Sequence, residues 1–303
     1  MPYCVTHNDL DGIGCAILME KVFPEVKTFT IDYRELPKVL PRVLEKAKTS
    51  QVYVTDLSLT DELAELCNKH GKVQHIDHHI SSKKPCEKYP WSLVDVNNCG
   101  TYLLWKMLSQ YANLEDYKEF VELVDNYDTW GHGTQPTEKA KDLNRLLKML
   151  GPDVFAQRFK HKSLVKFNDV EEAIINVDKH MEESYLQEVM TRAQAMRDKD
   201  GNVFLLVAAE QYTSSLGNYL LQQFEEAEYV LILDMLHDKA SLRSKGKVNV
   251  ADLAKDCGGG GHAKAAGFLM NDAAVKAFWR CDACEFRAQF RERGQTGDTT
   301  LDR

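Results

Sequence analysis

Val5-Thr6-His7-Asn8-Asp9-Leu10-Asp11-Gly12 places one imidazole and two carboxylates on alternate residues directly after an apolar run. On an extended backbone, residues two apart point to the same side, so His7, Asp9 and Asp11 are expected to converge. Burying three such polar groups without a partner is costly, and a divalent cation would satisfy all three. A polar turn with an N-capping aspartate explains the same residues, so this stretch alone leaves metal binding open.

The first half of the chain alternates short apolar runs with helix-like runs. This alternation predicts a parallel sheet with helices on both faces. Strands are expected over 3–6, 27–31, 51–55 and 72–76, and helices over 13–21, 37–48 and 60–70. Gly12 is expected to open the first helix, and Thr60 and Gly71 to cap and stop the third. From 100 to 160 the pattern is mainly helical, with breaks at Gly131 and at Gly151-Pro152.

The second half contains a separate α/β pattern. The charged, proline-free run 169–197 predicts a helix that connects two domains, or alternatively a surface helix of one large domain. Strands are expected over 203–207, 229–233 and 239–243, and helices over 214–224 and 250–256. The predicted fold is therefore α/β, with an N-terminal parallel-sheet domain (1–165), a helical linker (166–200), a smaller C-terminal α/β domain (201–285) and a polar tail (286–303).

Composition narrows the functional class. A net charge of −8 argues against a general surface for polyanions, so a nucleic-acid contact would need a local basic region. The sequence contains neither an apolar run near the ~20 residues of a membrane span nor a secretion signal. Eight cysteines without such a signal indicate reduced thiols. These features predict a cytoplasmic protein without membrane contact.

Further acidic residues follow the predicted strands. Asp56 comes directly after one strand, and Asp77-His78-His79 comes directly after the next. Ligands bind outside the carboxyl ends of strands in open parallel sheets, so these residues are expected to meet the first stretch. A fourth acidic site, with Asp125 and Asp128, ends a helix-like run.

These carboxylates are too many for one cation. Two divalent ions that share a bridging carboxylate fit their number. Oxygen and imidazole ligands without thiolate favour manganese, magnesium or cobalt over structural zinc. Two such metals typically clamp a phosphoryl group and activate water for in-line attack.

A glycine run near the C-terminus is a different signal. Gly258 to Gly261 with His262 could present backbone N–H groups to an anion, although a flexible loop is the simpler interpretation of this run alone. Arg243 ends the preceding predicted strand and could add a bidentate phosphate contact. Cys281 and Cys284 have zinc-knuckle spacing, but a second pair is not near them, so we do not expect zinc there.

Together these residues resemble the DHH phosphoesterases. The match comprises His7-Asn8-Asp9-Leu10-Asp11-Gly12, then Asp56, then Asp77-His78-His79, then an aspartate before a Thr-Trp pair. Ser241-Leu242-Arg243-Ser244, Gly258 to His262 and Ala265-Ala266-Gly267 resemble the DHH-associated C-terminal domain. The motifs occur in order and cover most of residues 3 to 270.

The resemblance implies roles for single residues. One manganese would be held by His7, Asp9 and Asp56, and the other by Asp11, Asp56, His78 and Asp128. His79 would contact the scissile phosphate, and Asp77 would orient the histidine pair. Substrate would be bound by Arg243, Gly259, Gly260, Gly261 and His262. Asp125 and Asp128 are both available in the fourth motif, and Asp128 is preferred because Thr-Trp follows it.

The resemblance also implies an activity. We expect a manganese-dependent phosphodiesterase that hydrolyses short oligonucleotides to 5′-mononucleotides, with Mg²⁺ or Co²⁺ as substitutes. Cyclic-dinucleotide hydrolysis, RecJ-like single-strand exonuclease activity and 3′-phosphoadenosine-5′-phosphate phosphatase activity are the alternatives. A catalytically silent nucleotide-binding protein is a rival of another class, but each expected metal ligand is present in the sequence. The oligomeric state, including a homodimer, stays open.

Overall fold

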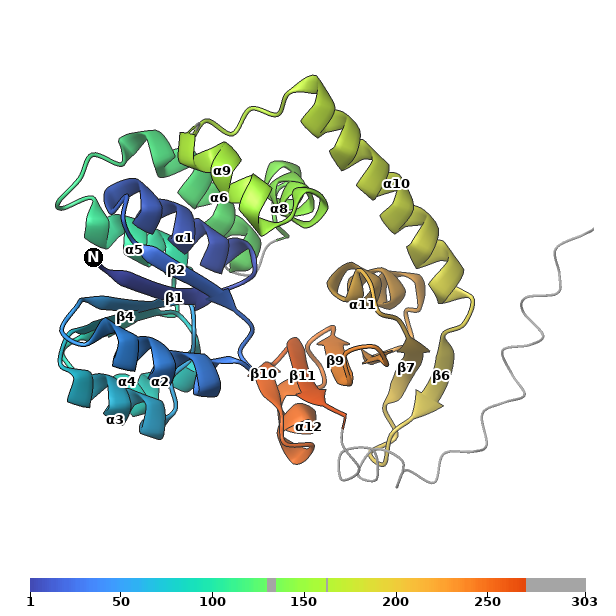
Figure 1. The fold of residues 1–303 in the computed structure, drawn as a ribbon. Coiled ribbons are helices and arrows are strands. Elements are labelled where there is room, and N and C mark those ends of the chain that lie inside the picture. Colours follow the sequence, from blue (N-terminus) through green and yellow to red (C-terminus); the bar gives the residue numbers. More distant parts are fainter. Residues whose placement is uncertain (130–134, 162, 271–303) are drawn as a thin grey trace, which may run out of the picture. The chain divides into compact units, whose positions relative to one another are not determined.

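The chain divides into two compact units, Met1–Asp178 and Lys179–Arg303, in a computed structural model that describes residues 1–129, 135–161 and 163–270. Each unit contains one sheet with helices packed on it (Figure 1). The division falls inside the predicted linker 166–200. Trp130, Gly131, Cys281, Cys284 and the predicted tail 286–303 lie outside the described residues.

The first unit is built on a five-stranded sheet in which every described pair of neighbours is parallel. Its strand order is β2-β1-β3-β4-β5. The strands are β1 (Tyr3–His7), β2 (Lys27–Ile31), β3 (Val52–Thr55), β4 (Val73–Asp77) and β5 (Ser92–Val94). The predicted parallel sheet is confirmed, and only the three-residue β5 was not predicted.

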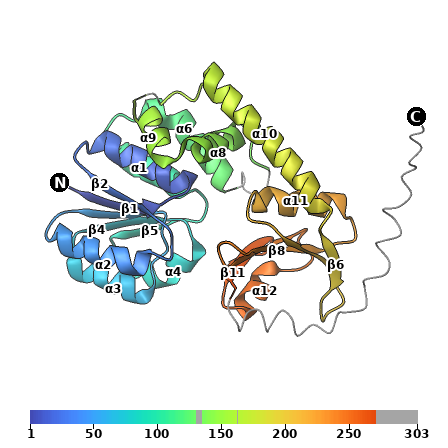
Figure 2. The same cartoon turned by 45° about the vertical axis from the view of Figure 1, so that its right-hand side comes forward.

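Helices cover both faces of this sheet (Figure 2). One layer contains α1 (Leu10–Val22), α5 (Gly100–Leu108), α6 (Lys118–Asp128), α8 (Glu138–Leu150) and α9 (Pro152–His161), with the 3₁₀ helix η1 (Glu115–Tyr117) before α6. The other layer contains α2 (Leu36–Ala47), α3 (Asp61–His70) and α4 (Ile80–Cys86). As predicted, Thr60 caps α3 and Gly71 ends it in a left-handed conformation.

The two layers enclose separate hydrophobic cores because side chains alternate along β1. Cys4 packs into the core under α1, whereas Tyr3 and Val5 pack into the core under α2 and α3. Successive residues of a strand point to opposite faces, so a strand buried on both sides is apolar throughout.

The first helix begins earlier than the sequence predicted. β1 ends at His7, and α1 starts at Leu10 with Asp9 as its N-cap, whose side chain accepts a hydrogen bond from the Gly12 amide. The extended backbone predicted through Asp11 is therefore wrong, since the capping bond favours helix at that point. A Cβ on Gly12 would lie 2.0 Å from the His7 carbonyl oxygen, so glycine allows the helix to follow the strand this closely.

The second unit has a mixed six-stranded sheet of order β10-β11-β9-β8-β7-β6. Its strands are β6 (Gln194–Arg197), β7 (Val203–Ala208), β8 (Tyr229–Asp234), β9 (Lys239–Ser244), β10 (Gly260–His262) and β11 (Ala265–Leu269). α11 (Thr213–Gln223) packs in one core of this unit and α12 (Val250–Asp256) in the other. The smaller C-terminal α/β domain is confirmed.

The structure differs from the simplest interpretation of the sequence at two places in this half. The helix predicted over 169–197 ends at Met190, and Gln194–Arg197 instead forms β6 beside β7. Part of the glycine run is not a loop, because Gly260–His262 pairs with β11 as β10. Both are short strands that pair antiparallel with the next strand along the chain, and their own residues lack the β-branched and aromatic side chains that indicate a strand.

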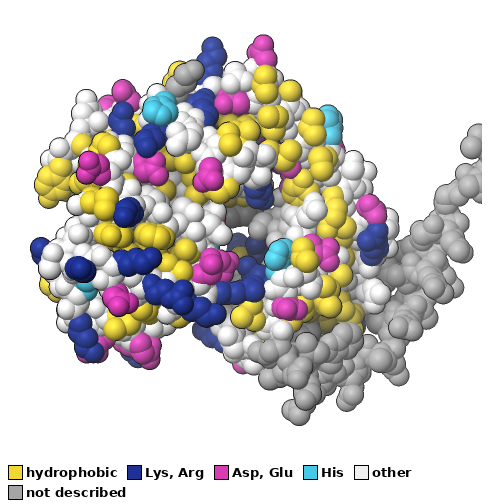
Figure 3. Space-filling model, viewed as in Figure 1, with side chains coloured by type: hydrophobic (Ala, Val, Ile, Leu, Met, Phe, Trp, Pro, Cys, Tyr) yellow, Lys and Arg dark blue, Asp and Glu magenta, His cyan; other side chains and the backbone are white. Residues whose placement is uncertain are grey.

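The connecting helix α10 (Asp169–Met190) exposes some of its apolar side chains and buries some of its charged ones. Val177 and Met181 are each 53% exposed, whereas Asp178 and Glu182 are buried. Hydrophobic side chains are visible along α10 in Figure 3. The buried face carries charges that pair with neighbouring side chains, and the Arg145 guanidinium lies 3.4 Å from the Asp178 carboxylate. Within the described residues, each helix is too short or too polar to cross a bilayer.

Candidate metal centre

Three neighbouring strands of the first unit end in polar side chains. β1, β3 and β4 are adjacent and parallel, so their carboxyl ends lie at one edge of the sheet. His7 ends β1, Asp56 directly follows β3, and Asp77 ends β4 before His78 and His79. The topology alone therefore brings the three segments predicted to form a site to the same place.

The first cluster consists of His7, Asp9 and Asp56. His7 Nδ1 lies 2.9 Å from Asp9 Oδ2 and 3.8 Å from Asp56 Oδ2. One ligand atom from each residue lies within 4.8 Å of the others, close enough for a single cation to contact all three.

The second cluster consists of Asp11, His78 and Asp128. His78 Nε2 lies 3.7 Å from Asp11 Oδ2 and 3.4 Å from Asp128 Oδ2. It also lies 3.4 Å from Asp56 Oδ1. Asp56 therefore directs one oxygen at each cluster, which is the geometry of a bridging carboxylate.

Burial and mutual repulsion disfavour the charged form of two of these carboxylates. The pKa values of Asp56 and Asp128 are raised well above the ordinary value, first by burial and then by the neighbouring carboxylates of Asp11 and Asp9. Burial also opposes ionisation of Asp9, but the contact with His7 and the hydrogen bond from the Gly12 amide together outweigh it and lower the pKa of Asp9 to about 2.

Several buried atoms that could bind a metal ion have no hydrogen-bond partner. Among the described residues, Asp56 Oδ2, His78 Nε2 and Asp128 Oδ2 are buried polar atoms without a hydrogen-bond partner. Orphaned buried polar atoms are rare in folded proteins and call for an explanation such as an ion. Carboxylate and imidazole donors suit manganese or magnesium, so these residues fit a divalent metal pair.

The N-terminus of α5 fixes Asp11. Asp11 Oδ2 accepts a hydrogen bond from the Gly100 amide at 2.7 Å, and Oδ1 accepts one from the Thr101 amide at 2.6 Å. A Cβ on Gly100 would lie 3.0 Å from Asp11 Oδ2 and 3.1 Å from the Asp56 Cβ. Glycine therefore lets the helix end approach two carboxylates of the site at once.

Contacts with the start of α5 distinguish Asp125 from Asp128. Asp125 Oδ1 accepts a hydrogen bond from the Cys99 amide at 2.7 Å, and Oδ2 accepts one from Asn98 at 3.2 Å. Asp125 is thus occupied in holding the start of α5, whereas Asp128 faces His78. The geometry favours Asp128, the residue preferred from the sequence.

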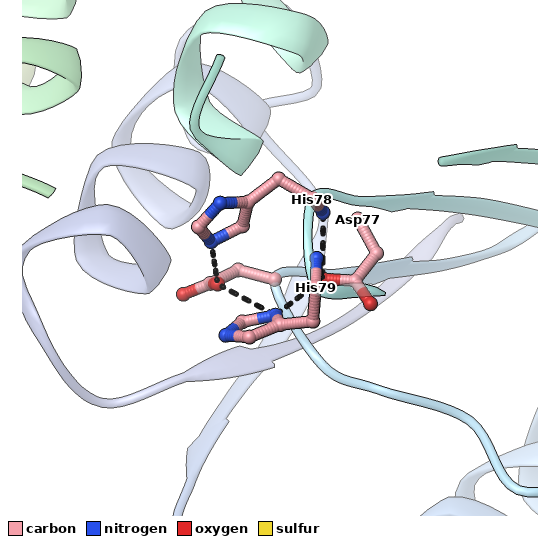
Figure 4. Close-up of side chains that lie close together, drawn as sticks. Asp77, His78 and His79 are labelled. Atoms are coloured by element: carbon pink, nitrogen blue, oxygen red, sulfur yellow. Dashed lines mark hydrogen bonds and ion pairs between the residues drawn. The ribbon is translucent and has the colours of Figure 1, made fainter. Parts of the chain in front are cut away.

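Asp77 lies below the histidine pair and is saturated with hydrogen bonds. Its Oδ1 accepts from the His78 amide at 2.8 Å and from His79 Nδ1 at 2.7 Å, and its Oδ2 accepts from the Ser82 hydroxyl. Figure 4 shows the carboxylate close to the backbone of both histidines. Burial opposes ionisation, but these donors outweigh it and lower the pKa of Asp77. Asp77 therefore holds the His79 ring and the backbone amides of both histidines, and it also lies near Asp56.

Asp56 has an unusual backbone conformation, with φ of +52°. Positive φ is uncommon outside glycine and is tolerated best by aspartate and asparagine. This conformation directly after β3 turns the side chain toward both clusters. Such local strain is often found at functional sites.

Sequence reasoning missed some residues of the site. Tyr33 contacts His79 and packs against His7 with its ring tilted, and Gly100 and Thr101 donate to Asp11. Tyr33 follows β2, whose carboxyl end lies beside that of β1, so the strand-end argument could have included it. Gly100 and Thr101 carry no comparable signal because they contribute backbone amides.

In the second unit, the sheet register aligns two predicted substrate-binding residues. Ala265 of β11 pairs with Arg243 on one side and with His262 on the other. The side chains of directly paired residues point to the same face. The Arg243 guanidinium donates to the Ser214 hydroxyl at 2.7 Å, and His262 is exposed. Gly259, Gly260 and Gly261 lead into this row.

Comparison with known proteins gives matches over both units. Residues 202–280 match the DHHA1 domain. The chain is 32% identical to the oligoribonuclease NrnB of Bacillus subtilis, over 92% of this chain and 75% of that protein. It is 26% identical to a 3′,5′-cyclic-nucleotide phosphodiesterase of Helicobacter pylori, over 88% of this chain and 91% of that protein.

A solved structure shares the fold. RecJ of Thermus thermophilus, determined in complex with Mn²⁺, matches with a TM-score of 0.62 at 15% identity. The match covers 92% of this chain and 50% of RecJ. At this level of identity, the similarity concerns the fold.

Proposed function

Because this chain belongs to the DHH family of metal-dependent phosphoesterases, we propose that it uses two manganese ions to hydrolyse short oligonucleotides to 5′-mononucleotides. The observation that carries this proposal is the pair of ligand clusters that share Asp56, with buried ligand atoms left open. The B. subtilis relative named an oligoribonuclease supports the substrate class.

The clusters define the proposed ligands. His7, Asp9 and Asp56 would hold one ion, and Asp11, Asp56, His78 and Asp128 the other. Two divalent ions, when bound, supply Lewis-acid stabilisation of charge on the phosphoryl group. Mg²⁺ or Co²⁺ suits the same ligands.

Hydrogen bonds within the chain orient side chains of the proposed site. Asp77 accepts a hydrogen bond from Nδ1 of His79 and so fixes the side of the ring that faces the site. We assign His79 to a non-bridging oxygen of the scissile phosphate, where a positioned donor would stabilise developing charge. The Gly100 and Thr101 amides hold the Asp11 carboxylate in place next to His78.

The second unit is assigned to substrate binding. Arg243 provides a guanidinium suited to phosphate, and His262 with Gly259, Gly260 and Gly261 provides further donors. The shared register row of Arg243 and His262 supports a common ligand for both. A neighbouring phosphate or a terminal nucleotide would fit these donors.

Hydrolysis of cyclic nucleotides is the second candidate. It is supported by the H. pylori relative, whose name is 3′,5′-cyclic-nucleotide phosphodiesterase. The proposed metal clusters would serve either reaction, so the substrate must be decided by experiment.

A hydrolysis panel with Mn²⁺ tests the proposal. It compares dinucleotides, a 20-mer, cyclic mononucleotides, cyclic dinucleotides and 3′-phosphoadenosine-5′-phosphate at equal concentration. We expect dinucleotides to be cleaved fastest and to release 5′-mononucleotides. Faster degradation of the 20-mer would instead favour a RecJ-like exonuclease, and faster opening of cyclic substrates would favour the second candidate.

A further inference from the structure

Tyr33 lies in a tightly braced turn between β2 and α2. The Asp32 amide donates to Glu35 Oε2 at 3.0 Å, and the Arg34 amide donates to Asp32 Oδ1 at 2.9 Å. The Glu35 amide also donates to the Asp32 carbonyl. These bonds fix the backbone on both sides of Tyr33, so its ring is held in a defined place.

From this turn, Tyr33 contacts the ends of three strands. Its ring lies 4.3 Å from the ring of His7, centroid to centroid. Its hydroxyl lies 2.9 Å from His79 Nε2 and 3.5 Å from the Asp56 carbonyl oxygen. Since β2 pairs with β1 in a register that places Ile31 opposite His7, Tyr33 extends over the carboxyl end of the sheet.

The direction of the bond with His79 follows from Asp77. Asp77 is an acceptor for His79 Nδ1 at 2.7 Å, so Nδ1 carries the proton. In a neutral imidazole, Nε2 is then an acceptor, and the Tyr33 hydroxyl must donate to it. His79 is therefore held at both ring nitrogens, by Asp77 on one side and by Tyr33 on the other.

We propose that Tyr33 is a positioning residue, whose hydroxyl keeps His79 Nε2 directed into the site until a phosphate oxygen of the substrate takes over that contact. This inference rests on the phosphate-binding role assigned to His79. In the free enzyme, the hydroxyl removes the rotational freedom of the ring. Without it, this ordering would have to be achieved during substrate binding, which weakens binding.

The ordering argument predicts where the kinetic effect appears. Tyr33→Phe removes the hydroxyl but keeps the ring that packs against His7. We expect KM for a dinucleotide to rise about 3- to 10-fold, the size of one neutral hydrogen bond. The value of kcat should stay near wild type, since the bound phosphate then holds His79. Mn²⁺ affinity should be unchanged.

A double-mutant cycle with His79→Ala separates positioning from a structural role. If Tyr33 acts through His79, Tyr33→Phe should lower kcat/KM in the wild-type background and have no further effect beside His79→Ala. Equal losses in both backgrounds, or no loss in wild type, would overturn the inference.

Tyr117→Phe is the matched control. It also removes one tyrosine hydroxyl, which bonds to the carbonyl oxygens of Phe159 and Lys160 in the core. We expect it to lower the melting temperature and leave KM unchanged. Full activity of His79→Ala would refute the role assigned to His79 itself, and the inference with it. If His79→Ala lowers kcat/KM as expected but Tyr33→Phe leaves kcat/KM unchanged, only the inference about Tyr33 is refuted.

Discussion

Two regions satisfy their charged side chains differently: the carboxyl edge of the first sheet, and the paired residues Arg243, Ala265 and His262 of the second sheet. At the first, Asp56 is buried and Asp128 is half-buried, both have raised pKa values, and one oxygen of each is buried without a hydrogen-bond partner among the described residues. At the second, Arg243 already donates to Ser214, and His262 is exposed. The first region has buried polar atoms that a bound cation would satisfy, whereas in the second region the Arg243 guanidinium already donates to a hydroxyl group.

The largest expected effect comes from a substitution of Asp56, the residue at the centre of the first region. Asp56→Asn keeps the side-chain shape and tolerates the positive φ, but removes the charge shared by both clusters. We expect turnover to fall by about 10³-fold or more, because both ions would be weakened. The measurement is kcat on a dinucleotide at saturating Mn²⁺.

Asp234→Asn is the control for that change. Asp234 also lies at a strand end and is buried, but it bonds to His237 in the second unit. Its substitution should leave kcat unchanged. Near-normal turnover of Asp56→Asn would remove Asp56 from the metal centre.

A second change distinguishes the two acidic residues of α6. Asp128→Ala should weaken Mn²⁺ binding well beyond the ~10–100-fold expected for a group outside the ligand set. Asp125→Ala should mainly cost stability, about 0.5–2 kcal/mol, because it removes the acceptor for the Cys99 amide at the start of α5. Mn²⁺ titration and thermal unfolding of both variants check this, and the opposite ranking would make Asp125 the ligand.

The third change acts on the second region. Arg243→Ala should lower kcat/KM for dinucleotides by about 1.5–3 kcal/mol, the range for a charged hydrogen bond. It should spare bis-p-nitrophenyl phosphate, a small ester that needs only the metal centre. Equal losses on both substrates would indicate a folding defect rather than lost substrate binding.

The smallest effect concerns stability against pH. Asp56 and Asp128 have pKa values raised above the ordinary value of 3.8, so the folded state holds protons that the unfolded state releases. The metal-free protein should therefore lose stability as pH rises above about 4. Asp9 and Asp77 have lowered pKa values and lose their contribution only at lower pH.

Melting temperatures in EDTA at pH 5.5 and pH 8 test this. We expect a lower value at pH 8, and excess Mn²⁺ should reverse the difference because the ions neutralise the ionised pair. Asp128→Asn should flatten the dependence in EDTA. A melting temperature that rises with pH in EDTA would contradict the electrostatic account.

The sequence predicted the site through topology more than through local geometry. Asp56 and Asp77 were placed correctly because parallel strands end at one edge of a sheet. The reason given for Asp11 was wrong, since it lies in the first turn of α1 and not on an extended chain. It still reaches the site, because the amides of α5 hold its carboxylate there.

What the sequence did not reveal depends on pairing and packing partners. β6 and β10 form hairpins with β7 and β11, but their own residues, Gln194–Arg197 and Gly260–His262, lack the β-branched and aromatic side chains typical of strands. Tyr33 resembles any tyrosine in a turn until β2 is placed next to β1. Val177 and Met181 of α10 are exposed although they are apolar, and sequence alone does not reveal which face of a helix is covered.

The bonds from Asp11 to the α5 amides also bear on the order of events during synthesis. They join residues 89 and 90 positions apart in the chain. A nascent chain that has not yet reached Gly100 contains Asp11 but lacks the amides that hold its carboxylate in the folded protein. The strand ends that carry His7 and Asp56 can assemble earlier, whereas the second cluster awaits α5 and α6. During synthesis, the residues of the first cluster are therefore complete before those of the second cluster.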